Sequence, residues 1–294
     1  MTTAPVGGHP GRVDESVSWR VHPALRPFVA TAVGYRHDSP APFHRGLPSP
    51  HLTLVVTIDR PLVLAAHPDP RQAPGGYDAL VGGLHTRPAL ISQRGPQAGV
   101  QLSLTPMGAR ALLGLPAGAL ASLDCALPEV LGGAGAELTA RFREASNWAG
   151  RFAAVERVLL RILRDDAAAP PEVQEAWRLT LAAAGRLRVE EIAHRIGWSS
   201  RHLLTRFRAE TGRTPKEAAR VARFDRARRA LAARVAAGRP ADLAALAATM
   251  GFTDQAHLTH EWRAFSGLPP TRWIAAEFGF RQDGTTAAAT SSPA

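Results

Sequence analysis

The chain has one cysteine, Cys125, among its 294 residues. A single cysteine cannot form an internal disulfide and cannot supply a thiolate cluster for a metal ion. Cys125 follows an apolar run and is most simply a small buried apolar side chain. We therefore expect this protein to be located in a reducing environment, the cytoplasm.

Long apolar runs are also missing. Hydrophobic residues make up 45% of the chain, yet no stretch approaches the roughly 18 uninterrupted apolar residues that a membrane helix needs. Residues 1–14 lack a charged segment followed by an apolar core, so we do not expect a secretion signal. The length is sufficient for two domains with separate cores, and we expect no membrane partner.

Signatures of catalysis and metal binding are absent from the sequence as well. It contains no nucleophile elbow, no phosphate-binding loop that ends in Gly-Lys, and no suggestive pair of carboxylates. The histidines of the first half do not have the His-x-His or His-x-x-x-His spacing of common metal sites. We therefore predict no catalytic residue, no metal and no cofactor, and we do not expect an enzyme.

Lysine is almost absent, because 34 of the 35 basic residues are arginine and only Lys216 is lysine. Genome composition alone can explain that choice, but not where the charge lies. Residues 171–294 hold 19 basic and 12 acidic side chains, whereas residues 1–170 hold 16 and 13. The net charge of +10 is therefore concentrated in the last part of the chain, as expected of a surface that neutralises phosphates.

A motif occurs twice in that basic part, with a spacing of about 55 residues. The copies cover 192–215 and 246–270, and both contain a glycine followed by an aromatic residue, then His-Leu, an aromatic-Arg pair and Gly-x-x-Pro. Each copy reads as a short helix, a tight turn at Gly197 or Gly251, and a second helix, which is the helix-turn-helix pattern. Two copies with the same positions favour DNA binding over two simply packed helix pairs.

Composition divides the chain into segments. We predict a flexible tail at 1–14, a sensing or dimerisation domain at 15–165, a linker at 166–171, a DNA-binding domain at 172–278 and a second tail at 279–294. Short β-branched runs predict strands at 51–58, 62–66, 79–83, 89–93 and 99–104. Apolar periodicity predicts helices at 106–113, 136–142, 152–163, 171–184, 189–196, 200–211, 215–236, 243–250 and 254–266.

The same periodicity separates the two faces of each second helix. In the first motif Leu203 and Phe207 should face the core, and in the second Leu258 and Trp262 should do so. The outward faces are then mostly polar and begin near the helix N-terminus, the end that enters the major groove in such motifs.

At these residues the chain resembles the AraC/XylS family of bacterial transcription regulators, over about 175–275. The resemblance is carried by the long helix between the motifs and by 192–193, 197–199, 201–203, Phe207, 210–212, Pro215 and 251–258. It implies two helix-turn-helix subdomains, joined by that helix, which enter two successive major-groove segments. The expected fold class is α+β, with an N-terminal β-rich cupin-like barrel with helices and a C-terminal all-α domain.

The resemblance also implies a set of DNA contacts. The predicted base contacts are Ser200, Arg201, Leu204, Thr205 and Arg206 in the first motif, and Gln255, Ala256, Thr259 and His260 in the second. The predicted phosphate contacts are Arg208, Lys216 and Arg263. Thr205 and His260 stand where the family commonly has arginine, and the neighbouring Arg206 is our substitute in the first motif.

The resemblance is weaker in the N-terminal domain. Residues 22–28 and 108–114 resemble a module that is joined to this DNA-binding domain in actinobacterial regulators. Strand-rich N-terminal domains of the family sense small molecules or dimerise. Candidate effector contacts are Trp19, Arg20, Tyr35, His51 and His85, each of which also reads as a surface or packing residue.

The combined prediction is a cytoplasmic, sequence-specific transcription regulator, an activator, that binds double-stranded DNA. Its further expected partners are a small-molecule effector, RNA polymerase and a second copy of the chain. Two alternatives stay open: a cupin-like enzyme with an appended DNA-binding domain, and an architectural protein without sequence preference. The operator, the effector, the sign of regulation and the oligomeric state are not encoded in any pattern that we find.

The substitution Arg201→Ala should relax sequence preference, because arginine pairs in a bidentate way with guanine. We expect a cost of about 1–3 kcal/mol at the contacted base pair. Affinities for the selected sequence and for random duplex measure the effect. An equal loss on both would contradict a base-reading role for Arg201.

Overall fold

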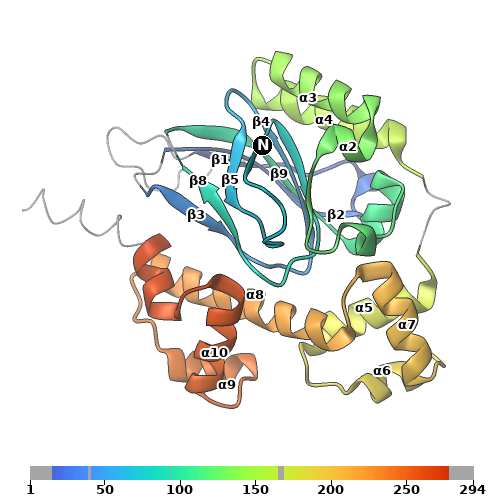
Figure 1. Cartoon of the computed structure of the whole chain (residues 1–294), viewed down its shortest axis with the longest axis vertical. Helices are drawn as coiled ribbons and strands as arrows, with labels where there is room; N and C mark the ends of the chain where they lie inside the picture. The colour runs from blue at the N-terminus through green and yellow to red at the C-terminus, as the bar shows by residue number, and fades with distance from the viewer. Residues whose placement is uncertain (1–14, 39–40, 94, 165–168, 278–294) are drawn as a thin grey trace, which may run out of the picture.

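The computed structural model describes residues 15–38, 41–93, 95–164 and 169–277 (Figure 1). The tails predicted at 1–14 and 279–294 lie outside the described residues, as do 166–168 of the predicted linker. Antiparallel strands and helices form the N-terminal part, and helices alone form the C-terminal part. The predicted α+β class is confirmed.

Six strands form the larger sheet, in the order β1-β2-β9-β4-β7-β10 with antiparallel neighbours. Strand β4 (Leu52–Thr57) is buried on both faces, with Leu54 in one cluster of apolar side chains and Val55 in another. Burial on both faces explains why this strand is a nearly continuous apolar run. The other strands of this sheet are β1 (Glu15–Ser18), β2 (Val29–His37), β7 (Ala79–Gly82), β9 (Gln97–Leu104) and β10 (Asp124–Ala126).

Four strands form the smaller sheet, in the order β3-β8-β5-β6. A compact apolar cluster joins the sheets, since Val55 and Leu80 of the larger sheet pack with Leu62 and Leu64 of the smaller one. The side chains of this cluster therefore fill the space between the two sheets where Val55 and Leu80 face Leu62 and Leu64. The strands are β3 (Phe43–Gly46), β5 (Leu62–Ala66), β6 (Gly75–Tyr77) and β8 (Ala89–Ser92).

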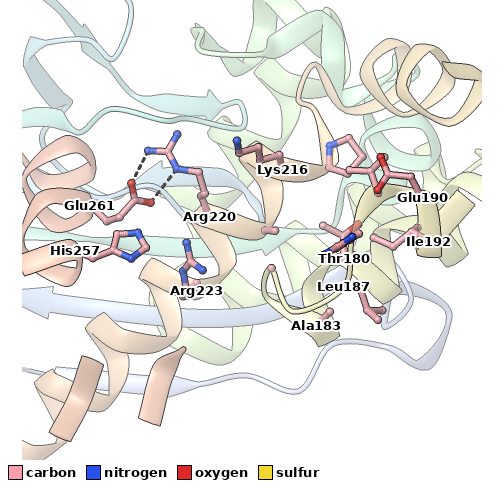
Figure 2. A pocket seen from close by; sticks show the side chains of 15 residues that line it. Thr180, Ala183, Leu187, Glu190, Ile192, Lys216, Arg220, Arg223, His257 and Glu261 are labelled. Carbon is pink, nitrogen blue, oxygen red and sulfur yellow. Dashed lines mark hydrogen bonds and ion pairs between the residues drawn. The ribbon is translucent and has the colours of Figure 1, made fainter. Parts of the chain in front are cut away.

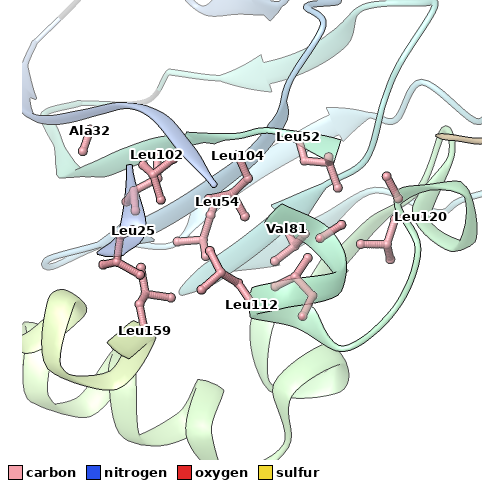
Figure 3. Packing of buried hydrophobic residues seen from close by; sticks show 14 of the residues in the cluster. Leu25, Ala32, Leu52, Leu54, Val81, Leu102, Leu104, Leu112, Leu120 and Leu159 are labelled. Atoms are coloured by element: carbon pink, nitrogen blue, oxygen red, sulfur yellow. The ribbon is translucent and has the colours of Figure 1, made fainter. Parts of the chain in front are cut away.

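Helices cover the other face of the larger sheet (Figure 1). In the core that they close, Leu54 of the sheet lies beside Leu112 of a helical segment, and Leu25 lies beside Leu159 (Figure 3). The helical segments of this part are η1 (Pro23–Leu25), α1 (Pro106–Gly108), η2 (Ala109–Leu113, a π-helical turn), η3 (Ala117–Leu120), α2 (Leu127–Leu131), α3 (Gly133–Glu144) and α4 (Trp148–Ile162).

The C-terminal part contains the two helix pairs and the long helix that the sequence predicts, and this prediction is confirmed. The two pairs lie at opposite ends of the long helix α8 (Figure 1). Thr214 and Glu217 form a capping box at its start, with Pro215 as the first helical residue. The helices are α5 (Pro171–Ala183), α6 (Val189–Arg195), α7 (Ser200–Thr211), α8 (Pro215–Ala236), α9 (Leu243–Met250) and α10 (Gln255–Ser266).

The first helix pair shares its core with the N-terminal part. The largest apolar cluster extends from the sheet to Trp177 of α5 and to Leu203 and Phe207 of α7. The second pair belongs to another cluster, in which Phe224 of α8 packs against Trp262 of α10. The two helix pairs thus have different structural neighbours.

Candidate nucleic-acid interface

The two helix-turn-helix units, α6–α7 and α9–α10, share the same turn conformation and the same kind of helix N-cap. Gly197 (φ +74°) and Gly251 (φ +77°) occupy the left-handed backbone region at the turns, which a side chain would strain. Ser199 caps α7 by accepting from the His202 amide at 3.2 Å. Asp254 caps α10 by accepting from the His257 amide at 2.7 Å. Both second helices therefore begin at a defined residue and present a defined face.

The C-terminal ends of α7 and α10 share a second feature, a hydrogen bond from a side-chain hydroxyl to a carbonyl one turn earlier. The hydroxyl of Thr211 donates to the Phe207 carbonyl at 2.8 Å, and that of Ser266 donates to the Trp262 carbonyl at the same distance. Both hydroxyls are buried, and each helix then ends at a glycine with positive φ. The repeat that is visible in the sequence thus extends to individual hydrogen bonds.

The outward face of α7 carries the predicted base contacts of the first motif. The inner face is closed, since Leu203 and Phe207 are fully buried. Ser200 is half-buried at the start of the helix. The exposed residues among the contacts predicted on this helix are Arg201, Leu204, Thr205, Arg206 and Arg208.

Arg206 lies apart from the other exposed contacts predicted on α7. At about 100° per residue it is roughly 150° around the helix from the centre of the row formed by Arg201, Leu204, Thr205 and Arg208. The corresponding position of α10 is Glu261, which is buried and bonded to Arg220 of α8. The structure therefore gives less support to Arg206 as a base contact than to the row itself.

On α10 the predicted contacts come together. Gln255, Ala256, Thr259, His260 and Arg263 line one shallow depression of about 460 Å³. Thr259 is half-buried and the other four are exposed. A set of four predicted base contacts and one predicted phosphate contact is thus contiguous on the surface.

A deeper cleft separates the two units, with a volume of about 620 Å³ (Figure 2). Lys216, Arg220 and Arg223 project into it from one face of α8, at the spacing of i, i+4 and i+7. Arg220 makes two hydrogen bonds to the Glu261 carboxylate, at 2.9 and 2.8 Å. Arg223 lies over the ring of Phe252 at 4.9 Å. The sequence prediction included Lys216 and missed the two arginines, although their spacing was the available signal.

The N-terminal part holds the C-terminal end of α7. Arg110 of η2 donates to the Glu210 carboxylate at 2.6 Å, and Glu210 is buried. Arg213, just beyond α7, donates to the Leu84 carbonyl and to the Ser122 hydroxyl. Each of these partners lies in the N-terminal part, so the orientation of α7 depends on that part.

A close backbone contact reinforces this junction. A side chain at Gly118 of η3 would lie 2.8 Å from the Ala209 carbonyl oxygen and 2.9 Å from the Gly212 nitrogen. A side chain at Gly212 would lie 2.4 Å from the β-carbon of Ala121. Two glycines thus allow η3 and the end of α7 to touch along their backbones.

The five effector candidates do not come together in one site. Trp19 stacks on Phe152 of α4 at 4.9 Å, and Arg20 beside it is exposed. Tyr35 packs between the sheets, where burial raises its pKa to about 12. Their roles as effector contacts stay predictions.

Two of these candidates lie close to charged partners. His51 interacts with the charges of Asp225 and Arg229 on α8, and burial lowers its pKa. His85 bonds the buried Asp124 at 3.1 Å, and Asp124 also bonds the buried His67 at 2.9 Å. The His67–Asp124–His85 group was not singled out from the sequence, because its members are far apart along the chain.

Comparison with known proteins identifies the C-terminal part. Residues 192–276 match the family model described as a helix-turn-helix domain. This region is an AraC-type helix-turn-helix domain. The chain is accordingly a DNA-binding transcription regulator, and the match begins within α6 and includes all of α7, α8, α9 and α10. No curated protein matches the sequence. The helices of the described residues include none with the length and the apolar character of a membrane span.

Solved structures of ToxT from Vibrio cholerae are similar to the chain. The O395 protein is 11% identical with a TM-score of 0.48, over 85% of this chain and 98% of that chain. The P21 crystal form is 11% identical with a TM-score of 0.49, over 84% and 98%. The wild-type protein with bound unsaturated fatty acid, from strain SCE256, is 10% identical with a TM-score of 0.47, over 86% and 96%.

The ion pair in the cleft predicts a pH-dependent stability. Burial alone would raise the pKa of Glu261, but hydrogen bonds from Arg220 and nearby positive charges outweigh it and hold this pKa below its ordinary 4.5. A lowered pKa in the folded state stabilises the fold above the unfolded pKa, and this contribution is lost as the pH falls through the folded pKa. Glu261→Gln should therefore cost roughly 1–2 kcal/mol at pH 7.

Urea unfolding at pH 7 and at decreasing pH measures this cost. The gap between the wild type and Glu261→Gln should shrink once the pH falls below about 4.5, the ordinary value. Glu190→Gln, at an exposed glutamate that lines the same cleft, is the matched control and should stay within about 0.5 kcal/mol of the wild type. A gap that is independent of pH would rule out the ion pair as its cause.

Proposed function

We propose that this regulator reads a specific double-stranded sequence by placing α7 and α10 in successive major-groove segments. The observation that carries the proposal is the pair of outward faces at the two ends of α8. This helix has 22 residues. At about 1.5 Å per residue it spans roughly 33 Å, which is close to the roughly 34 Å of one duplex turn.

The exposed side chains divide into two roles. Arg201 suits guanine and Gln255 suits adenine, since each can make two hydrogen bonds to the major-groove edge of that base. Arg208, Lys216 and Arg263 are exposed and suit phosphates, which set affinity and register without reading sequence. We add Arg223 to the phosphate contacts, because it lines the cleft on the same face of α8 as Lys216.

We further propose that the N-terminal part controls the first unit through the end of α7. The contacts of Arg110 with Glu210, and of Arg213 with Leu84 and Ser122, support this route. The signal would come from a small-molecule effector, a second copy of the chain or RNA polymerase, with activation as the outcome. The cytoplasm, where its target DNA lies, is the proposed site of action.

The proposed geometry predicts a strict spacing of half-sites. Sequences selected from a random duplex library should contain two conserved segments whose centres are about 10 base pairs apart. Inserting five base pairs between them turns the second segment to the opposite face of the duplex, so affinity should fall to that of a single half-site. Inserting ten restores the face but doubles the separation to two duplex turns, so affinity should also stay at that of a single half-site. Competition with random duplex measures specificity.

A specific reader should hold its selected site at least about 10³-fold more tightly than random duplex. A ratio near one would instead support the architectural alternative. Affinity that is unchanged by the five-base-pair insertion would contradict the fixed placement of the two helices.

The route through α7 predicts an effect at one half-site. Arg110→Ala leaves the buried Glu210 carboxylate without its partner and should loosen the end of α7. Affinity should fall by about 2- to 30-fold on duplexes that keep only the first half-site. Duplexes that keep only the second half-site, and the exposed α4 variant Arg157→Ala, are the controls. Equal losses on both half-sites would contradict the route.

A further inference from the structure

The base-reading row of α7 has an apolar centre. Leu204 has 39% of its surface exposed and is one of three large apolar side chains that are exposed among the described residues. It is not required for the core, since Leu203 and Phe207 already close that side and are fully buried. An exposed leucine on this row is therefore available for an apolar contact outside the chain.

Thr205, the next residue in the row, does not supply a free hydroxyl donor. Its Oγ1 donates to the Arg201 carbonyl one turn earlier, at 3.1 Å. The proton of the hydroxyl is thus used within the helix. What this side chain can still offer a base edge is its methyl group and an oxygen lone pair, so Thr205 extends the apolar character of Leu204.

The charged members of the row lie on both sides of this centre along the helix. Arg201 precedes Leu204 by three residues and Arg208 follows it by four, and both are exposed. The row of α10 differs, because Gln255, Thr259 and His260 bring polar groups to the equivalent surface. The two helices therefore present different chemistry to the duplex.

The major groove holds one apolar feature on its base edges, the C5-methyl group of thymine. We infer that α7 reads the C5-methyl of a pyrimidine, thymine in ordinary DNA, through Leu204 and the methyl group of Thr205. This inference rests on the proposed function and adds the chemical class that the first half-site must contain. Arg201 and Arg208 then fix the helix over that base through neighbouring base or phosphate groups.

The test uses the full chain and the sequence selected from the random library. Each thymine of the first half-site is replaced in turn by deoxyuracil, which removes the methyl group and keeps the pairing. At one thymine or more, the wild type should lose about fourfold in affinity, the factor that corresponds to one buried methyl group. At the same position cytosine and 5-methylcytosine are compared, and methylation should recover a similar factor.

Three variants assign the effect to named side chains. Leu204→Ala should remove most of the difference between thymine and deoxyuracil, and Thr205→Ser, which keeps the hydroxyl and removes the methyl group, should reduce it. Thr205→Val, which keeps a methyl group and removes the hydroxyl, should retain it. Thr259→Ala on α10 is the control and should leave the difference unchanged, with thermal melts confirming that each variant is folded.

The outcomes separate this inference from the function on which it rests. If no sequence is selected over random duplex, the proposed function is wrong, and the inference falls with it. If a sequence is selected but its first half-site lacks thymine, or tolerates deoxyuracil everywhere, the methyl readout alone is overturned. A methyl effect that persists in Leu204→Ala and Thr205→Ser would likewise overturn the assignment to these residues.

Discussion

The packing of α8 determines where α7 and α10 lie relative to each other. Ala218, near its start, belongs to the cluster that contains Phe207 of α7, whereas Phe224 belongs to the cluster that contains Trp262 of α10. Each recognition helix is therefore seated on a different stretch of the same rigid rod. Interiors that are packed this closely tolerate little sliding, so α7 and α10 keep fixed places along α8.

The arginine-rich surface is divided by its acidic partners. Asp225 is buried and bonds Arg228 and Arg229 on the side of α8 near His51 of the N-terminal part. Arg208, Lys216 and Arg263 have no acidic partner among the ion pairs of the described residues. Positive charge is thus compensated where it assists folding, and it is left available on the side where phosphates would lie.

Helices were more predictable from this sequence than strands, for physical reasons. The apolar period and the caps, such as Ser199 and Asp254, are local signals, and the structure contains every predicted helix of the C-terminal part. Five predicted strands are present, but β1, β2, β3, β6 and β10 were missed. Strand β2 contains Gly34, which weakens a strand signal, yet a side chain there would meet the Trp148 ring of α4 at 2.7 Å. The glycine is required by a contact that no local pattern reveals.

The candidate site was predictable for a similar reason and to a similar limit. Helix spacing placed Arg201 and Gln255 on outward faces, and both are exposed. The partners of Glu210 and Arg213 were not predictable, because Arg110 and Leu84 lie 100 and 129 residues away along the chain. The use of the Thr205 hydroxyl within its own helix depends on a side-chain rotamer, which residue type alone does not determine.

The pair of glycines at 118 and 212 has a consequence for how such a protein could be rebuilt. Their backbones touch, so neither position accepts a β-carbon while the other segment stays in place. A chimera that joins this N-terminal part to the DNA-binding domain of another regulator would therefore need glycine on both sides of this contact. Glycine at each of these two positions is thus a steric requirement of the other half of the protein, so both glycines would have to be kept together.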